Sequence, residues 1–283
     1  MDNSWNKRKL KIFSLVTACL LLLVGYKEEY PMNHAKLEGL VSIAHRGAAV
    51  YAPENTRIAF QKGLELGADI LECDVHLSKD GQLIIMHDEK VDRTTNGKGF
   101  IKDFTLEELR KLDAGGKFHR DFTGEPIITL DELLEEFYGH IGLLIEIKKP
   151  LLYPGIEEKV ALLLENYENL NRVIVQSFDI ESMRKMHHLV PELQIAILMK
   201  ASAIPPSLQR VKDLTSFATY INFNILYVNE RIVDQIHNYG GKVLVWSVKT
   251  PRLVDKAYRY NVDGIITDFS HWPEEVPFHL VRE

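Results

Sequence analysis

The sequence predicts an α/β protein, a (β/α)8 TIM barrel with a small insertion after the second strand and an N-terminal segment in front of it. From Leu40 onward, short apolar runs rich in β-forming residues alternate with helical patterns, which is typical of a parallel sheet. The length of 283 residues also suits one barrel, since such domains commonly have about 250 residues. We find no linker rich in Pro, Gly or Ser and no internal repeat, which indicates one domain after the N-terminal segment.

Nine runs have the character of strands, one more than a closed eight-stranded barrel uses. They are residues 41–45, 70–77, 83–87, 142–148, 172–178, 194–199, 220–225, 242–248 and 264–268. Only residues 78–82 separate the second run from the third, whereas parallel neighbours need a crossover of about a dozen residues. We therefore expect these two runs to form a hairpin with Asp80-Gly81 in the turn. Eight parallel strands then remain.

The insertion lies between His87 and Gly142 and has about 50 residues, more than a single crossover requires. Two capping boxes predict its helices, because a Thr and a Glu three residues later can satisfy each other's backbone N–H groups. Thr105 and Glu108 predict a short helix over residues 105–112. Thr129 and Glu132 predict a second helix over residues 130–138.

The N-terminal segment has the pattern of a signal or membrane anchor. Lys7, Arg8, Lys9 and Lys11 precede an apolar run over residues 12–26. No small-x-small cleavage site follows, which favours retention over removal, and the positive-inside rule leaves the globular part outside the cytoplasm. We expect residues 1–30 to anchor the chain in the cell membrane as a single-pass helix and residues 40–283 to form the extracytoplasmic barrel domain. Cleavage would instead give a secreted protein, and a core helix of the domain is the alternative.

The charge balance excludes one class of partner. With 34 basic and 40 acidic residues the net charge is −6, which argues against a broad nucleic-acid-binding face but allows a local cationic pocket. The two cysteines, Cys19 and Cys73, lie in the apolar N-terminal run and between two carboxylates of the second strand, so a disulfide between them is not expected. The sequence sets neither the redox compartment nor the oligomeric state.

Three carboxylates are expected at the mouth of the barrel, where the carboxyl ends of the strands form the active site. Glu72 and Asp74 stand two apart and therefore on one face of the second strand, and Glu146 lies on the next parallel strand. Such groups repel one another unless something positive lies between them, and oxygen ligands suit Ca²⁺ or Mg²⁺. We predict that they bind one divalent cation; the alternative is that each pairs with an Arg or Lys. His76 shares the face of Glu72 and Asp74 and is interpreted as a neighbour.

Two histidines and three further residues complete the candidate site. His45 and His87 end the first strand and the hairpin, and a histidine pair can give and take a proton in one displacement, although a lone histidine is more often structural. Arg46 and Lys148 are the cations expected to hold a phosphate. Trp246 supplies an apolar wall for the substrate or fills the barrel interior.

Motifs along the whole barrel region carry a family resemblance. They are Ile43-Ala44-His45-Arg46-Gly47, Pro53-Glu54-Asn55-Thr56, Leu71-Glu72-Cys73-Asp74-Val75, Lys79-Asp80-Gly81, Met86-His87-Asp88, Arg93-Thr94-Thr95-Asn96-Gly97, Ile128-Thr129-Leu130-Asp131-Glu132-Leu133, Glu146-Ile147-Lys148, Gln176-Ser177-Phe178, Val245-Trp246-Ser247-Val248 and Gly264-Ile265-Ile266-Thr267-Asp268. In this order they resemble the glycerophosphodiester phosphodiesterase family over about residues 41–275. His119 lies where members of that family vary.

The resemblance implies a (β/α)8 barrel that hydrolyses glycerophosphodiesters to sn-glycerol 3-phosphate and an alcohol. It implies that His45 and His87 are the general acid–base pair, and that a divalent cation is bound by three carboxylates: Glu72, Asp74 and Glu146. It further implies that Arg46 and Lys148 hold the phosphate and that Trp246 packs on the glycerol. In this family the substrate's own 2-hydroxyl is described as attacking phosphorus, giving a cyclic phosphate that water opens.

Two other functions stay open. A phospholipase D- or C-like hydrolase of lysolipids or membrane lipids is favoured by the predicted anchor, and a wide apolar rim at the barrel mouth would support it. A tight polar pocket would support soluble glycerophosphodiesters. A catalytically silent cell-surface binding module would lack at least one key residue, and the sequence retains them all.

Overall fold

The computed structural model describes residues 39–269. The predicted anchor, residues 1–30, lies outside the described residues, as does Cys19. Between residues 39 and 269 no helix is both long and apolar enough to cross a membrane. Cys73 is buried in the second strand and is a free thiol.

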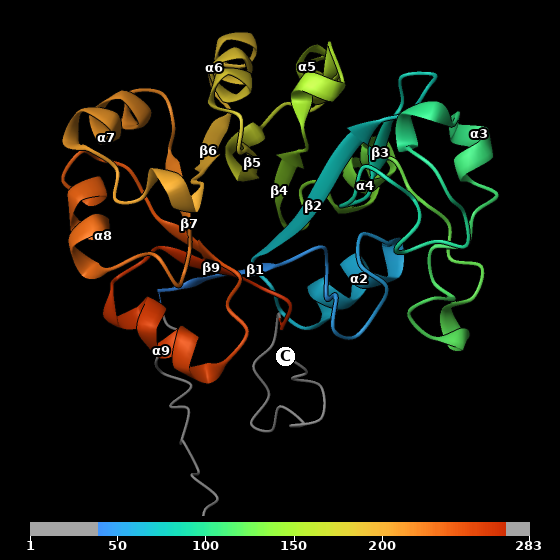
Figure 1. The fold of residues 1–283 in the computed structure, drawn as a ribbon, viewed down its shortest axis with the longest axis horizontal. Helices are drawn as coiled ribbons and strands as arrows, with labels where there is room; N and C mark the ends of the chain where they lie inside the picture. Colours follow the sequence, from blue (N-terminus) through green and yellow to red (C-terminus); the bar gives the residue numbers. More distant parts are fainter. Residues whose placement is uncertain (1–38, 270–283) are drawn as a thin grey trace, which may run out of the picture. The chain divides into compact units, whose positions relative to one another are not determined.

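Eight parallel strands close into a barrel (Figure 1). In order around the barrel they are β1 (Val41–Ala44), β2 (Ile70–Leu77), β4 (Gly142–Ile147), β5 (Val173–Ser177), β6 (Gln194–Leu198), β7 (Tyr220–Asn224), β8 (Leu244–Trp246) and β9 (Gly264–Thr267). Strand β1 pairs with both β9 and β2, which closes the ring. The ninth run, β3 (Leu83–Ile85), pairs antiparallel with β2 in the expected hairpin. The predicted eight-stranded barrel with a hairpin excursion is confirmed.

Most strands end one or two residues before the predicted ends. Strand β4 ends at Ile147 rather than at residue 148, and β9 ends at Thr267 rather than at residue 268. The residues beyond these ends lead into the loops at the mouth of the barrel, and some still donate to the neighbouring strand, as Lys148 N does to Val75 O at 3.1 Å. Strand β8 is also shorter at its start, because Lys242 forms only an isolated bridge with Tyr220.

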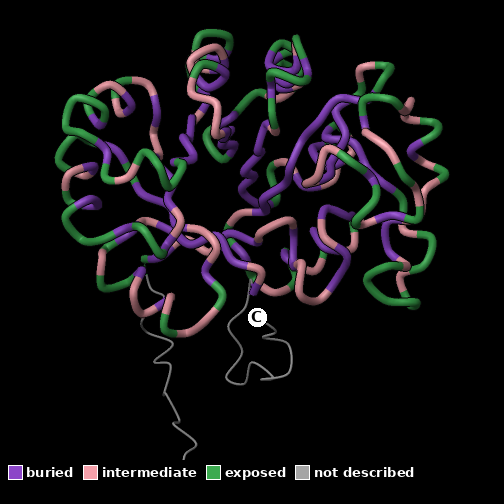
Figure 2. The backbone as a smooth tube through the Cα atoms, in the orientation of Figure 1, coloured by how far each residue is buried: buried purple, intermediate pink, exposed green. Residues whose placement is uncertain are grey.

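Helices cover the outside of the sheet, and most begin at a residue whose side chain accepts a hydrogen bond from the first turn. They are α2 (Arg57–Glu65), α5 (Ile156–Leu164), α6 (Ile180–Leu189), α7 (Leu208–Thr215), α8 (Glu230–His237) and α9 (Pro251–Arg259). In the insertion, α3 (Leu106–Leu109) and α4 (Leu130–Phe137) begin with the two predicted capping boxes. Helix α3 is shorter than predicted. In Figure 2 the strands are buried and the outer faces of the helices are exposed.

The barrel interior positions the site by simple strand periodicity. Its core contains Ile43 of β1, Leu144 of β4 and Ile266 of β9, with equivalent residues of the other strands. Successive side chains of a strand point to opposite faces, so residues two further along point inward again, one layer closer to the mouth. That layer contains His45 and Glu146. Apolar residues therefore fill the bottom of the barrel, and polar residues gather at its carboxyl end.

Candidate active site at the mouth of the barrel

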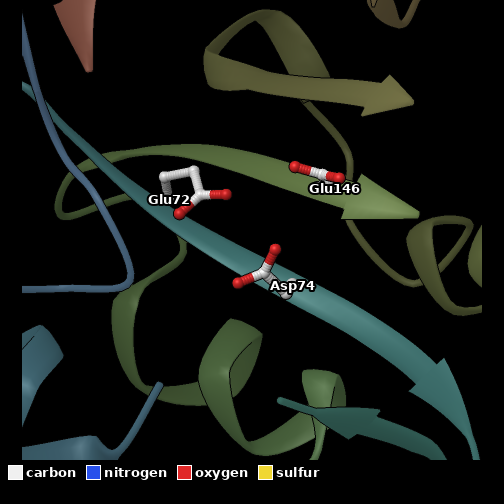
Figure 3. Close-up of side chains that lie close together, drawn as sticks. All are labelled: Glu72, Asp74 and Glu146. Atoms are coloured by element: carbon white, nitrogen blue, oxygen red, sulfur yellow. The ribbon is translucent and has the colours of Figure 1, made fainter. Parts of the chain in front are cut away.

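Three buried carboxylates lie together at the carboxyl end of β2 and β4 (Figure 3). One oxygen from each of Glu72, Asp74 and Glu146 lies within 4.8 Å of the others. Asp74 and Glu146 are direct partners in the register of β2 and β4, and Glu72 stands two residues earlier on the same face of β2. The three side chains that the sequence singled out as metal ligands are thus brought together.

The electrostatics of this cluster favour an added cation. Burial, reinforced by the charge of Asp74, raises the pKa of Glu72 to about 8. Burial also raises the pKa of Glu146. Burial alone would do the same to Asp74, but the charges of Lys148 and Arg46 outweigh it and hold the pKa of Asp74 well below its usual range. Two of the three carboxylates therefore resist ionisation unless more positive charge is supplied.

The ion pairs expected as an alternative to a metal exist, but they are incomplete. Lys148 Nζ lies 2.7 Å from Glu146 Oε1 and 3.2 Å from Asp74 Oδ1. Arg46 Nε lies 3.5 Å from Asp74 Oδ2. Glu72 instead accepts a hydrogen bond of 2.8 Å from the backbone N–H of Arg46.

The acids and the cations of the surrounding network are unequal in number. Its carboxylates are Glu54, Glu72, Asp74, Asp88, Glu146 and Asp268, and its permanent cations are Arg46, Arg93, Lys148 and Lys249. Six acids therefore face four permanent cations, and a protonated His45 adds one further positive charge beside Asp268. The six acids cannot all ionise without more positive charge, and three oxygen donors suit a hard divalent ion such as Ca²⁺ or Mg²⁺. The residues present therefore fit such a cation.

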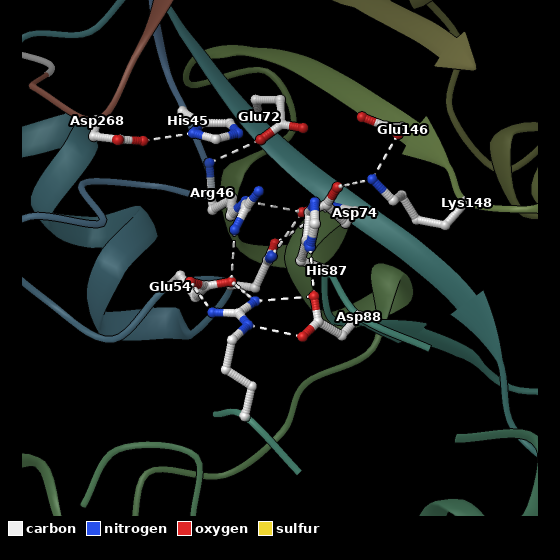
Figure 4. Close-up of polar contacts among 12 residues, drawn as sticks. His45, Arg46, Glu54, Glu72, Asp74, His87, Asp88, Glu146, Lys148 and Asp268 are labelled. Carbon is white, nitrogen blue, oxygen red and sulfur yellow. Dashed lines mark hydrogen bonds and ion pairs between the residues drawn. The ribbon is translucent and has the colours of Figure 1, made fainter. Parts of the chain in front are cut away.

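His45 forms a half-buried pair with Asp268 on the opposite side of the carboxylates from Lys148 (Figure 4). The Nδ1 atom of His45 lies 2.5 Å from Asp268 Oδ1. Burial would lower the pKa of His45, but the hydrogen bond to Asp268 and the charge of Glu72 outweigh it and raise that pKa. The same contacts lower the pKa of Asp268 to about 2 despite its burial. The pair therefore stabilises a protonated imidazole beside a carboxylate.

His87 also pairs with an aspartate, but its pKa is shifted in the opposite direction. Its Nδ1 lies 2.7 Å from Asp88 Oδ1. Burial lowers the pKa of His87, and the positive charges of Lys148 and Arg46 lower it further, against the charge of Asp74. The two histidines predicted from the sequence thus flank the carboxylates, and their pKa values are shifted in opposite directions. Such a difference is expected where one group gives a proton and the other takes one.

Several residues of the network were quoted only as parts of motifs in the sequence and received no role. Glu54 accepts hydrogen bonds from Arg46 Nη1 at 2.9 Å and from Arg93 Nη1 at 2.7 Å. Arg93 also contacts Asp88, so it joins the loop after β1 to the loop after β3. Asn55 Nδ2 donates to Asp74 Oδ2 at 2.8 Å. These contacts orient Arg46, Asp74 and the partner of His87.

The turn that carries Arg46 requires the glycine that follows it. Arg46 and Gly47 both have left-handed backbone angles, with φ of 55° and 80°. A Cβ atom on Gly47 would lie 2.5 Å from the backbone carbon of Ala59, because the turn packs directly on α2. The turn presents the backbone N–H of Arg46 to Glu72, and the Arg46 carbonyl accepts a hydrogen bond from the N–H of Asn55 at 3.0 Å.

The structure shows what Trp246 and His76 contact, which the sequence alone could not decide. Trp246 ends β8, packs against the interior cluster and contacts the Phe178 ring edge-to-face at 5.8 Å, while remaining partly exposed. It therefore both closes the barrel interior and forms part of the mouth. His76 is buried and its Nε2 donates to the His87 carbonyl at 3.1 Å. Burial lowers the pKa of His76 to about 4, so it is neutral and supports the loop that carries His87.

Comparisons with known proteins agree on one family. The model of the glycerophosphoryl diester phosphodiesterase family matches residues 45–271. A glycerophosphodiester phosphodiesterase of Caldanaerobacter subterraneus is 43% identical over 243 residues, which are 85% of this chain and 97% of that protein. A solved glycerophosphodiester phosphodiesterase of Agrobacterium tumefaciens is 31% identical, has a TM-score of 0.71, and is matched over 81% of this chain and 96% of its own.

A further solved structure contains a reaction product. It is an Oleispira antarctica phosphodiesterase in complex with the product sn-glycerol-3-phosphate, and it is 29% identical to this chain. The match has a TM-score of 0.74 and covers 83% of this chain and 96% of that one.

Proposed function

The chain belongs to the glycerophosphoryl diester phosphodiesterase family, and we propose that it hydrolyses glycerophosphodiesters to sn-glycerol 3-phosphate and an alcohol with the help of one divalent cation. The observation that carries this proposal is the buried cluster of Glu72, Asp74 and Glu146 flanked by two histidines of opposite pKa shift. A phosphodiester is an anion that repels nucleophiles, so an enzyme that cleaves it needs positive charge and a pair of proton-transfer groups.

The substrate phosphate is held by Arg46 and Lys148. Both side chains reach the mouth of the barrel, where each is about one-sixth exposed or less, at 17% and 13%. The cation, when bound by Glu72, Asp74 and Glu146, neutralises charge on the phosphodiester and so lowers the barrier to nucleophilic attack. Trp246 and Phe178 form the apolar part of the mouth, against which the glycerol packs.

The two histidines have different roles in this proposal. His87, whose pKa is lowered, is neutral near pH 7 and accepts the proton of the attacking hydroxyl. His45, whose protonated form is stabilised by Asp268, donates its proton to the oxygen of the departing alcohol. The two exchange roles when water completes the hydrolysis, which returns both to their starting states.

A panel of substrates tests this function. The purified chain is incubated with glycerophosphocholine, glycerophosphoethanolamine, glycerophosphoglycerol and a lysolipid, each with Ca²⁺ or Mg²⁺ and with EDTA. We expect release of sn-glycerol 3-phosphate from at least one glycerophosphodiester, loss of that activity in EDTA, and its return with one of the two ions. Turnover that is indifferent to chelation would contradict the role of the carboxylate cluster. The panel also identifies the ion and the leaving alcohol.

The membrane attachment belongs to the same proposal. We propose that residues 1–30 anchor the chain in the cell membrane and that the barrel, residues 40–283, faces the outside. The support is the cluster of four cations before the apolar run over residues 12–26.

A second candidate function, hydrolysis of lysolipids or membrane lipids, is favoured by one observation. Leu151 and Leu226 are exposed on the loops that follow β4 and β7, at the same end of the barrel as the site.

A further inference from the structure

Two pairs of exposed apolar residues lie at the mouth of the barrel. Leu151 and Leu152 follow β4, and Leu226 and Tyr227 follow β7; we call these four residues the apolar rim. Leu151 is 87% exposed and Leu226 is 64% exposed. Because the carboxyl ends of parallel strands meet at one end of a barrel, both pairs lie at the end that carries the candidate active site.

The first pair is held on a fixed platform. The short helix Pro150–Leu152 is closed by hydrogen bonds from Leu152 N to Lys149 O and from Tyr153 N to Pro150 O, both 2.9 Å. Pro150 and Tyr153 are buried, and the Tyr153 ring lies edge-on to His76 at 5.2 Å. Leu151 and Leu152 therefore extend into solvent from a backbone that is packed in place.

The second pair is displayed in the same way. Asn224 accepts from the N–H of Leu226 through its side chain at 2.9 Å and from the N–H of Tyr227 through its carbonyl at 3.0 Å. The flanking residues Ile225 and Val228 are buried, and Lys256 donates to the carbonyl of Ile225 at 2.7 Å. Two ordered turns thus bury their neighbours and expose a leucine at each tip. Exposed apolar residues in pairs on one surface indicate a binding site more than scattered single ones do.

One unpaired cation lies beside the apolar rim. The loops over residues 148–155, 199–207 and 224–229 contain three lysines and no Asp or Glu. Lys148 pairs with Asp74 and Glu146, and Lys149 pairs with Glu89. Lys200 is exposed and forms no ion pair with any residue between 39 and 269. Lys200 therefore supplies the positive charge next to the rim.

We propose that the apolar rim docks on an anionic lipid bilayer, with Leu151 and Leu226 entering the headgroup region and Lys200 facing the lipid phosphates. Apolar tips beside the unpaired Lys200 match such a surface, because apolar side chains partition into it and a cation is attracted to its charge. The pairs stand on separate loops with β5 and β6 between them, and two separate apolar tips suit a fluid surface better than a shaped protein partner. The active-site mouth would then open towards the lipid surface. The proposal goes beyond the hydrolytic function, since docking needs no catalytic residue.

Vesicle binding of residues 37–283 tests the proposal without the predicted anchor, whose own membrane affinity would mask the rim. This part forms a compact unit, and the Caldanaerobacter relative is matched over 97% of its length, so a relative consisting almost wholly of the barrel exists. We expect it to sediment with vesicles of phosphatidylglycerol and phosphatidylcholine, and much less with phosphatidylcholine alone. Leu151→Ser and Leu226→Ser should each lower the partition coefficient about 10-fold. Lys200→Glu should lower binding to the anionic vesicles about 10-fold or more, since it reverses a charge.

Leu162→Ser is the matched control. Leu162 is 64% exposed, like Leu226, but lies on the outer helix α5, so its replacement should leave binding unchanged. No binding by the unaltered barrel, or an equal loss with Leu162→Ser, would overturn the proposal. A loss confined to monomeric lysolipid turnover, with vesicle binding intact in Leu226→Ser, would also overturn it and assign the rim to a substrate acyl chain. Hydrolysis of soluble glycerophosphocholine, measured in parallel, reports on the catalytic function independently.

Discussion

Replacing Asp268 with Asn should remove the general acid without removing His45 itself. The 2.5 Å contact between His45 Nδ1 and Asp268 Oδ1 is largely shielded from solvent, with the two side chains 17% and 16% exposed. An amide cannot compensate the charge of an imidazolium, and its NH₂ group can donate to Nδ1 and impose the other tautomer. We expect kcat to fall about 10²- to 10⁴-fold. That range corresponds to about 2.7–5.4 kcal/mol of transition-state stabilisation.

The pH profile separates this role from a merely structural one. Because Asp268 raises the pKa of His45, the protonated acid is present below that pKa and is lost as the pH rises through it. Loss of the Asp268 charge lowers this pKa, so the alkaline limb of kcat should move to lower pH. Steady-state hydrolysis of glycerophosphocholine between pH 5 and 9 at about saturating cation measures both effects.

The chain offers a matched control for this substitution. Asp263 lies 2.9 Å from His237 Nε2 and precedes β9, whereas Asp268 follows it, so the two histidine–aspartate pairs lie at opposite ends of the barrel. Asp263→Asn should leave both kcat and the pH profile unchanged. The reasoning would be refuted by an Asp268→Asn enzyme with near-normal kcat and an unmoved alkaline limb, or by an equal loss in Asp263→Asn.

Other substitutions test the remaining parts of the site. His45→Ala and His87→Ala should each lower kcat at least about 10²-fold in steady-state assays, and near-normal turnover of His87→Ala would contradict its role. The acid limb of the unaltered enzyme should lie below the ordinary histidine pKa, because that of His87 is lowered; an acid limb above it would disagree with this assignment. Glu72→Gln should weaken divalent-cation binding in isothermal titration calorimetry at least about 10-fold, as loss of a charged ligand predicts, and unchanged affinity would exclude Glu72 as a ligand. Gly47→Ala should cost about 1–3 kcal/mol or more in urea unfolding, because φ is 80° and the new Cβ would meet Ala59; unchanged stability would show that the turn can rearrange.

Much of the barrel could be predicted because strand character and hairpin spacing are local properties of the sequence. The five residues between β2 and β3 excluded a parallel pair, and this alone reduced nine runs to eight barrel strands. The carboxylate cluster was also accessible, since Glu72 and Asp74 share a face by the strand period and Glu146 lies on the neighbouring strand. Local pattern and strand order together were sufficient there.

The residues that orient the site were not accessible in the same way. Asp268 lies 223 residues from His45, and nothing local distinguishes it from any other aspartate at a strand end. Glu54 and Arg93 meet across 39 residues because two long loops fold towards each other. Such contacts depend on loop conformation, including left-handed Arg46 and Asn55, which no periodic pattern encodes. The opposite pKa shifts of the two histidines depend on burial and on charges that the fold brings close, so they could not be predicted from the sequence either.

Phosphorus NMR of the products tests the central claim most directly. Purified chain is incubated with the glycerophosphodiester that the substrate panel identifies, first in EDTA and then with Ca²⁺ or Mg²⁺ added in excess. We predict no turnover in EDTA and, with the cation, conversion of the diester into sn-glycerol 3-phosphate and the free alcohol. Cleavage on the other side of phosphorus, giving the phosphorylated alcohol and glycerol, would contradict this function, and so would full activity in EDTA.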